Sequence, residues 1–420
     1  MTRADRTAWT LPPLELLLLP ALVVVLVGVL TPSSELFPNQ FDVYLYFQKA
    51  EAFAQGALPY TQFELEYPPL ALVPMVVPYL ASPGSPPTFE AFQWLFLVWQ
   101  AVLLVGLVIA LTGIAQRLSP TNRDGTAIRL VVLTIVAAPS LAWRFDLFPA
   151  LLSAVALLAA LNGRAATAGV AIALGVLAKL YPAVLVPVLV LPWLLERDWR
   201  RVGRFALAGL ATFTLVVVPV YGLVGDAIWS PITYQNQRGL QVETLGGGLL
   251  LLRALLTEQP ARLTFDFGAV HVAGPLAERI LAIQLPVLIA ALGGIALLAL
   301  RRFRAEVARL GAIQPASLVM AVAATIGALL VTNKVFSVQY VVWLLPFAAL
   351  LSRRQFWLFV LIAGLSIGIH PLFYDLLIRQ LPQPIVLLNV RNALVVVLAV
   401  WCVAGLWQNL GTERGVVEER

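Results

Sequence analysis

The 420-residue chain has 28 Lys and Arg and 22 Asp and Glu, so 12% of its residues are charged, whereas 60% are hydrophobic and the mean hydropathy is +0.88. So few charges cannot cover a water-facing surface, which excludes a soluble enzyme, a disordered scaffold and a secreted disulfide-bonded domain. One cysteine, Cys402, and two histidines, His271 and His370, exclude an intrachain disulfide and a zinc site of the usual ligand number.

Apolar runs along the whole chain predict an all-α fold, a polytopic membrane bundle of about twelve spans that forms a single domain over 1–420. The expected spans are 14–31, 90–114, 129–143, 147–162, 165–178, 183–195, 205–225, 280–300, 315–332, 340–352, 355–370 and 386–408. The first run follows Arg3 and Arg6 and also resembles a signal peptide, but residues 31–35 lack a small-x-small cleavage site, so we expect an uncleaved helix.

The first large outer loop is expected over about 32–89 and should carry juxtamembrane helices. Val43, Phe47, Ala50 and Phe53 follow a helical spacing, which predicts an amphipathic helix on the membrane with Asp42 near its start. Asp42 could simply cap that helix, Glu66 could be a turn residue, and Lys49 could extend from the interface to water. Residues 67–81 are apolar but short and contain four prolines, so we expect a juxtamembrane or re-entrant segment there.

Two apolar runs, 128–161 and 165–195, are each too long for one crossing and too short for two full ones. Arg144 and Asp146 divide the first run, and Lys179 divides the second. Such short hairpins would leave their tips below the membrane surface, where a charge must face protein or a water-filled cavity. The sequence therefore predicts a polar cavity at the outer side.

The second large outer loop is expected over about 226–278. Its segment 234–243 includes Arg238 and Gln241 among other amides and charges, which suit sugar hydroxyls but are equally typical of a solvated loop. Farther on, His370 at an outer helix end could assist a phosphate or an acceptor, or could be an interfacial histidine with a local hydrogen bond.

The charges indicate one orientation under the rule that basic residues collect in cytoplasmic loops. With both termini inside, the inner side has 18 basic and 9 acidic residues, and the outer side has 10 basic and 13 acidic. All inner basic residues are arginines, whereas Lys49, Lys179 and Lys334 are all outside. We therefore expect a multi-pass protein of the cell membrane. Because its basic residues are dispersed between apolar spans, nucleic acid is not an expected partner.

Several short motifs together resemble one membrane-enzyme family. They lie at 42–44, 56–60, 66–70, 144–146, 163–164, 178–182, 333–340 and 343–346. Their order is similar to that of the C-superfamily (GT-C) membrane glycosyltransferases, and most of all to the bacterial and archaeal α-mannosyltransferase-like branch that uses polyprenyl-phosphate sugars. This resemblance covers about residues 14–350.

The resemblance implies transfer of one sugar, mannose in that branch, from a polyprenyl-phosphate carrier to a glycolipid, polysaccharide or protein acceptor at the outer face. Asp42 matches the general base of an inverting reaction, because a carboxylate can take the proton of the acceptor hydroxyl. Cations would stabilise the leaving phosphate. The expected substrate-binding residues are Glu66, Tyr67, Arg144, Asp146, Lys179, Arg238, Gln241, Lys334, Gln339, Tyr340 and His370.

Two questions stay open from the sequence. A divalent metal is possible, because Asp42, Glu64, Glu66 and Asp146 could gather around one, but cationic side chains could replace it. The alternative function is a secondary transporter, since twelve spans are common in that class. Against it, the chain has no internal repeat, and its two largest polar loops are both outside.

Overall fold

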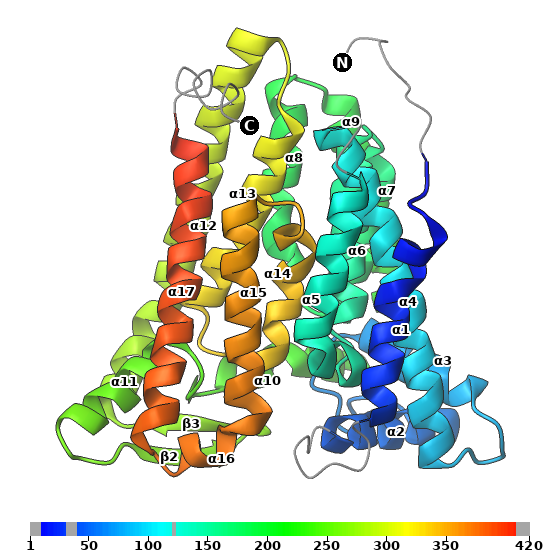
Figure 1. Ribbon diagram of the computed structural model, residues 1–420. Helices are drawn as coiled ribbons and strands as arrows, with labels where there is room; N and C mark the ends of the chain where they lie inside the picture. Colours follow the sequence, from blue (N-terminus) through cyan, green and yellow to red (C-terminus); the bar gives the residue numbers. More distant parts are fainter. Residues whose placement is uncertain (1–9, 31–39, 120–122, 409–420) are drawn as a thin grey trace.

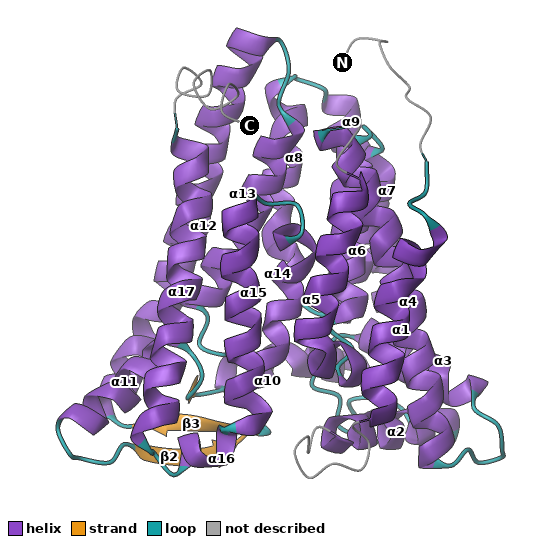
Figure 2. Cartoon of the chain, in the orientation of Figure 1, coloured by secondary structure: helices purple, strands orange, loops and turns teal. Residues whose placement is uncertain are grey.

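The computed structural model describes residues 10–30, 40–119 and 123–408, and it consists of a helix bundle with one small sheet (Figures 1 and 2). The segment 31–35, in which a signal-peptide cleavage was considered, lies outside the described residues, as do Arg3, Arg6, Arg414 and Arg420. The helices that correspond to the expected spans are α1 (Leu14–Leu30), α4 (Phe89–Leu118), α5 (Arg123–Trp143), α6 (Leu147–Leu161), α7 (Ala165–Ala178), α8 (Val186–Leu195), α9 (Trp199–Val224), α12 (Pro275–Leu310), α13 (Pro315–Thr332), α14 (Val341–Ala348), α15 (Arg353–Ile367) and α17 (Pro382–Trp407).

All twelve expected spans are helical, but only seven of the described helical segments are long and apolar enough to cross a membrane. These seven contain α4, α5, α9, α12, α13, α15 and α17. The other five expected spans are α1, α6, α7, α8 and α14, which have 8 to 17 residues. The chain is therefore a helical membrane protein with seven full-length candidate spans, and shorter apolar helices complete the bundle.

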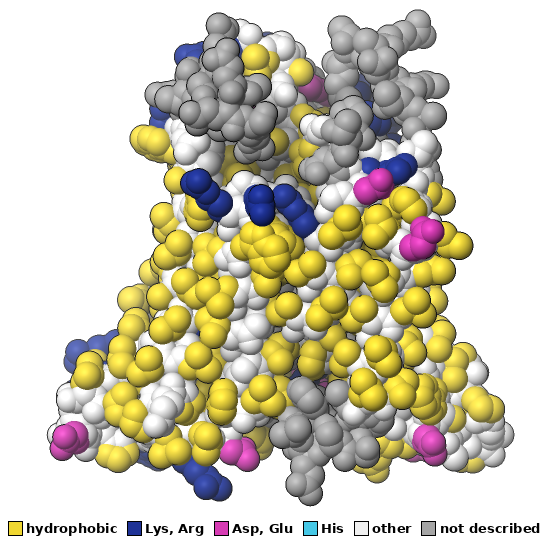
Figure 3. Space-filling model, in the orientation of Figure 1, with side chains coloured by type: hydrophobic (Ala, Val, Ile, Leu, Met, Phe, Trp, Pro, Cys, Tyr) yellow, Lys and Arg dark blue, Asp and Glu magenta, His cyan; other side chains and the backbone are white. Residues whose placement is uncertain are grey.

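The helices alternate in direction, so that α1 begins and α17 ends at the same end of the bundle (Figure 1). Apolar side chains cover the middle of the visible face, and several Lys and Arg side chains lie in a row above them (Figure 3). Only 6% of the residues in the apolar stretches of α9 and of α12 are buried, and the rest are exposed or half-buried. Such surfaces are typical of helices that contact lipid.

The opposite end of the bundle contains the shorter elements. They are α2 (Gln40–Ala54), η1 (Pro69–Leu72), α3 (Val73–Ala81), η2 (Tyr181–Leu185), η3 (Gly225–Trp229), α10 (Ser230–Gln237), α11 (Leu245–Leu256), η4 (Val338–Tyr340), η5 (Gly368–Leu372), α16 (Tyr374–Ile378), β1 (Leu240–Gln241), β2 (Arg262–Asp266) and β3 (Ala269–Ala273). The strands form an antiparallel sheet in the order β1-β3-β2. Phe267 and Gly268 have positive φ in the two-residue turn between β2 and β3, which is typical of a tight hairpin. The second large loop thus contains a sheet that we did not expect in an all-α fold.

The first large loop contains the expected helix, with two differences. α2 begins at Gln40, so Asp42 lies inside its first turn, and the alternative in which Asp42 caps the helix does not hold. Val43, Phe47 and Ala50 are buried in the protein rather than placed on the membrane, whereas Phe53 is 42% exposed. The buried face of α2 packs on α3 and α4, so α2 is fixed to the protein and holds Asp42 in place.

The short helices α6 and α7 place the charged tips deep in the protein. With 15 and 14 residues, they span about 22 and 21 Å, less than the ~30 Å hydrocarbon thickness of a bilayer. The turn before α6 contains Arg144 and Asp146, and the turn after α7 contains Lys179. Asp146 and Lys179 are buried. The expected burial of charge at these hairpins is confirmed.

Candidate functional site

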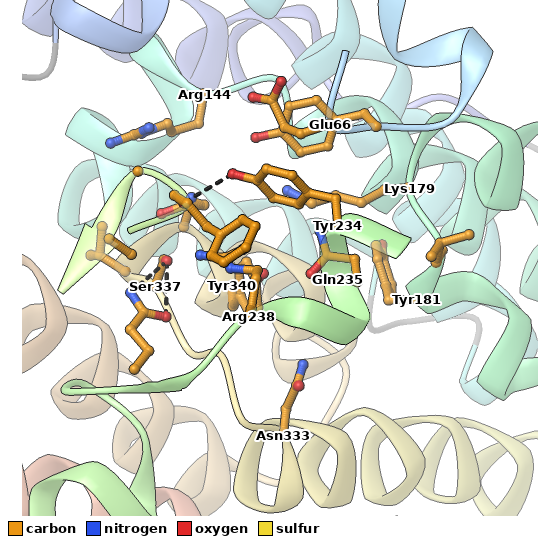
Figure 4. A pocket seen from close by; sticks show the side chains of 18 of the residues that line it. Glu66, Arg144, Lys179, Tyr181, Tyr234, Gln235, Arg238, Asn333, Ser337 and Tyr340 are labelled. Atoms are coloured by element: carbon orange, nitrogen blue, oxygen red, sulfur yellow. Dashed lines mark hydrogen bonds between the residues drawn. The ribbon is translucent and has the colours of Figure 1, made fainter. Parts of the chain in front are cut away.

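A cavity of about 590 Å³ lies where these turns meet α2, α10, the β-hairpin and the segment after α13. Ten of the twelve expected site residues line it: Asp42, Glu66, Tyr67, Arg144, Lys179, Arg238, Gln241, Gln339, Tyr340 and His370. Arg144 and Glu66 lie on one side and Asn333 on the other, with Tyr234, Tyr340 and Arg238 between them (Figure 4). Residues far apart in the sequence therefore form one chamber with both polar and apolar walls.

Asp42 and Arg144 form an ion pair at the wall of this cavity. Asp42 comes from the first turn of α2, and Arg144 comes from the turn between α5 and α6. The Gln100 amide of α4 donates a hydrogen bond to the Arg144 carbonyl and thereby fixes the same turn. A carboxylate and a guanidinium thus face one chamber side by side.

Glu66 forms an ion pair with Lys49 of α2, and the Lys49 ammonium lies 5.9 Å from the centre of the Tyr67 ring. The interpretation of Lys49 as a residue that extends from the interface to water is therefore wrong, because its partner is inside the protein. Tyr60 Oη donates a hydrogen bond to the Tyr67 carbonyl at 3.0 Å, which secures the loop that presents Glu66. The pair joins α2 to this loop.

Lys179 is the most enclosed cation of the lining, with 8% of its surface exposed. Its Nζ donates to Asp146 Oδ1 at 2.6 Å. Burial lowers the pKa of Lys179, and the Asp146 carboxylate opposes that shift. Asp146 itself is 1% exposed and is not among the lining residues, so the structure does not place it where we expected a substrate contact.

Three aromatic rings form a continuous stack beside Lys179. Tyr181 stacks on Trp343 at 4.3 Å between ring centres, and Trp343 stacks on Tyr340 at 3.8 Å. Tyr181 and Trp343 were missing from the expected site although both line the cavity. The sequence does contain a signal for Trp343. It lies three residues after Tyr340, and residues three apart share a helix face.

Arg238 at the end of α10 adds a third cation to the lining. It lies 5.8 Å from the centre of the Tyr234 ring, and Tyr234 Oη donates to the Phe267 carbonyl at 2.9 Å. The last contact, drawn dashed in Figure 4, ties α10 to the tip of the hairpin. α10 and the hairpin therefore form one wall of the cavity.

Gln241 is buried, and its side chain has protein partners. Its Oε1 accepts from the Phe336 amide at 2.9 Å, and its Nε2 donates to Glu243 at 2.8 Å and to Ser337 at 3.0 Å. The arrangement favours a structural role for Gln241 over the expected substrate contact. Burial raises the pKa of Glu243 to about 7, and nearby Arg391 and Arg144 limit the shift.

Lys334 is not among the lining residues, contrary to the expectation for a phosphate-binding cation. Its Nζ donates to the Asn236 carbonyl at 2.8 Å, so its ammonium joins the segment after α13 to α10. Partial burial and the charge of Arg238 lower the pKa of Lys334.

His370 does line the cavity, at the end of α15, and its ring packs edge-on against Tyr374 at 4.8 Å between centres. Its Nδ1 is buried, and the described part of the chain offers it no hydrogen-bond partner. The described residues therefore do not supply a local hydrogen bond at Nδ1, whereas the place in the lining suits the first role, that of assisting a phosphate or an acceptor.

The four carboxylates considered for a metal do not gather, and no group of three His, Cys, Asp or Glu side chains in the described residues could hold one. Asp42, Glu66 and Asp146 each pair with a different cation instead, and Glu64 is exposed. The lining of the described cavity contains three cations, Arg144, Lys179 and Arg238, and three carboxylates, Asp42, Glu66 and Glu243. The chain as a whole matches no known family model, and no curated protein matches it either.

Proposed function

We propose that the protein is a membrane glycosyltransferase that moves one sugar, mannose in our proposal, from a polyprenyl-phosphate carrier to an acceptor hydroxyl. The single observation that carries the proposal is the pairing of Asp42 with Arg144 in a cavity that also contains Lys179 and Arg238. A base beside fixed cations is what transfer from a phosphate leaving group requires.

The cations provide the donor side of the proposed site. Arg144 can engage two phosphate oxygens at once, and Lys179 supplies a second charge in a poorly hydrated setting. The lining continues over four apolar side chains: Leu180 just before η2, Val184 of η2, Leu288 of α12 and Leu329 of α13. These side chains offer an apolar surface to the first isoprene units of the carrier.

The amides provide the acceptor side. Gln235, Asn333 and Gln339 line the cavity together with the aromatic stack. Amides that bond hydroxyls and rings that pack on apolar faces are the usual means of holding a sugar. This chemistry suits the donor sugar and an acceptor hydroxyl of a glycolipid or polysaccharide, and the same groups could receive a protein acceptor.

The proposed reaction is a single displacement. The acceptor oxygen forms a bond to the anomeric carbon as its proton passes to the Asp42 carboxylate. The bond between that carbon and the phosphate oxygen breaks, and its electron pair leaves with the polyprenyl phosphate. Arg144 must turn from Asp42 towards the phosphate before this step, which frees the base at the moment when the donor is bound.

The site would lie at the outer face of the cell membrane. In this orientation the loops rich in arginine face the cytoplasm, together with both termini, as the charge rule requires. Polyprenyl-phosphate sugars would then reach the cavity from the outer leaflet.

The test is donor-dependent labelling of extracted lipids and polymers by membranes with and without the protein, with radioactive mannose on a polyprenyl-phosphate carrier. We expect a labelled product that needs the protein, and its loss in Asp42→Asn. An unchanged product with Asp42→Asn would refute the role of Asp42. Solute uptake by proteoliposomes of the pure protein, without sugar transfer, would favour the transporter.

A further inference from the structure

Asp146 has an unusual set of partners for a residue that does not line the cavity. Its Oδ1 accepts two hydrogen bonds of 2.6 Å each, one from Lys179 Nζ and one from Trp343 Nε1. Both donors line the cavity, whereas the carboxylate lies behind them. One oxygen atom therefore sets the position of a cation and of an aromatic ring on the cavity wall.

The surroundings of Lys179 leave this carboxylate as its main ionic partner. Four rings surround the ammonium, with centres 4.9 to 5.5 Å away: Tyr67, Phe145, Tyr340 and Trp343. The faces of such rings favour a cation but cannot accept a full hydrogen bond in place of water. The other charges that act on Lys179 are Arg144 and Arg238, and both repel it.

Trp343 donates its hydrogen bond to the same Asp146 oxygen and is also the central ring of the aromatic stack. Because Tyr181 and Tyr340 pack on its two sides, a shift of Trp343 would move the whole stack. Asp146 lies 197 residues from Trp343 in the sequence, so the hydrogen bond also fixes α14 against the turn between α5 and α6.

We propose that Asp146 is a positioning residue, which holds Lys179 and Trp343 as one unit so that the ammonium faces the phosphate of the donor and the ring stack faces its sugar. The contact between Asp146 and the two side chains is independent of any function. The part that concerns the donor rests on the function proposed above.

The first experiment measures the ammonium directly and needs no enzymatic activity. The chain has three lysines, so acetylation of each can be followed separately by mass spectrometry after brief exposure of the purified protein to acetic anhydride at a series of pH values. In Asp146→Asn, the lost charge should lower the pKa of Lys179 by about 1 unit or more, which raises its acetylation about tenfold at a given pH. Lys49 and Lys334 in the same sample serve as matched controls and should not change.

An Asp146→Asn protein that elutes as a single species and keeps the wild-type acetylation curve at Lys179 would overturn the proposal. Should this variant not fold, Trp343→Phe provides the second test, because it keeps a six-membered ring in the stack and removes the pyrrole ring together with the N–H that Asp146 accepts. We expect Trp343→Phe to leave the acetylation curves of Lys49 and Lys334 unchanged and to alter that of Lys179. If all three lysines of Trp343→Phe gave the same acetylation curves as in the wild type, the proposal that Asp146 holds Lys179 and Trp343 as one unit would again be contradicted.

The second experiment measures transfer kinetics against donor concentration. Displacement of Lys179 and the stack should raise the donor KM about tenfold in Asp146→Asn and less in Trp343→Phe, with a smaller change in kcat. A merely structural defect would reduce the amount of active enzyme and leave KM as it was. If the wild-type protein transfers no sugar, the proposed function fails, whereas the acetylation curves still decide whether Asp146 holds Lys179.

Discussion

The contact between α7 and α9 allows a sharp test of how the bundle is packed. Gly169 of α7 lies directly against the backbone of α9, and a Cβ atom added there would lie 2.2 Å from the Phe205 carbonyl oxygen and 3.2 Å from the Gly209 nitrogen. Backbone cannot move aside as a flexible side chain can, so Gly169→Ala must push the two helices apart. α7 ends at Ala178 and Lys179 is its C-cap, so a shift of α7 would also move a residue of the cavity lining.

The expected cost is at the upper end of the range for overpacking, about 3 kcal/mol. Replacement of glycine by alanine inside a helix also stabilises the helix by about 1 kcal/mol. A matched control must therefore contain the same replacement without the clash. Gly203→Ala provides it, because Gly203 is in α9 and no atom lies within 4 Å of an added Cβ. The difference between the two variants then isolates the overpacking.

For 420 residues the entropy of unfolding is about 0.9 kcal/mol per degree, so 3 kcal/mol corresponds to a Tm difference of about 3 °C. Thermal unfolding in one detergent, followed by intrinsic fluorescence for both variants side by side, would measure it. We expect Gly169→Ala to unfold below the wild type and Gly203→Ala at or above it. Equal Tm values for the two variants would refute the close approach of α7 and α9.

Three further predictions concern the cavity. Asp42→Asn should lower kcat by about 10²- to 10⁴-fold, whereas Glu64→Gln, an exposed carboxylate of the same loop, should transfer sugar at the wild-type rate; equal rates for both variants would contradict the assignment of the base. Burial raises the pKa of Glu243 to about 7, so the folded protein binds a proton that the unfolded chain has lost, and the free energy of unfolding should fall as the pH rises from about 5 to 7. Glu243→Gln should weaken this fall in pH-dependent Tm measurements, and an identical slope would show that Glu243 titrates normally. Lys334→Ala should leave the donor KM within about twofold of the wild type, because Lys334 does not line the cavity. A tenfold rise in KM would show instead that Lys334 contributes to donor binding.

The features that the sequence predicted well depend on local chemistry. Apolar runs must form helices in a membrane, since no water is present to satisfy the backbone, and all twelve runs are helical. The short lengths of α6 and α7 likewise predicted that Arg144 and Lys179 would meet in a cavity, which is confirmed. These conclusions need only the composition and length of one segment at a time.

The features that the sequence could not predict depend on pairing between distant segments. Nothing near Asp146 in the sequence indicates that the distant Trp343 donates a hydrogen bond to it, so the sequence alone predicts a substrate contact for Asp146. Lys334 has a sequence context as favourable as that of Lys179, yet a backbone carbonyl of α10 draws its ammonium away from the lining. The small sheet was missed for the same reason, because β1 pairs with a strand about thirty residues later across a helix.

The two ends of the molecule differ in how their charge responds to acidity. Every described basic side chain in the loops beside the start of α1 and the end of α17 is an arginine, and guanidinium groups stay protonated at any pH that a cell meets. The cavity end instead contains Lys179 and Glu243, whose pKa values are displaced from their usual range by burial. The charge of these arginines is therefore constant, whereas changes in proton concentration act on Glu243 at the cavity end.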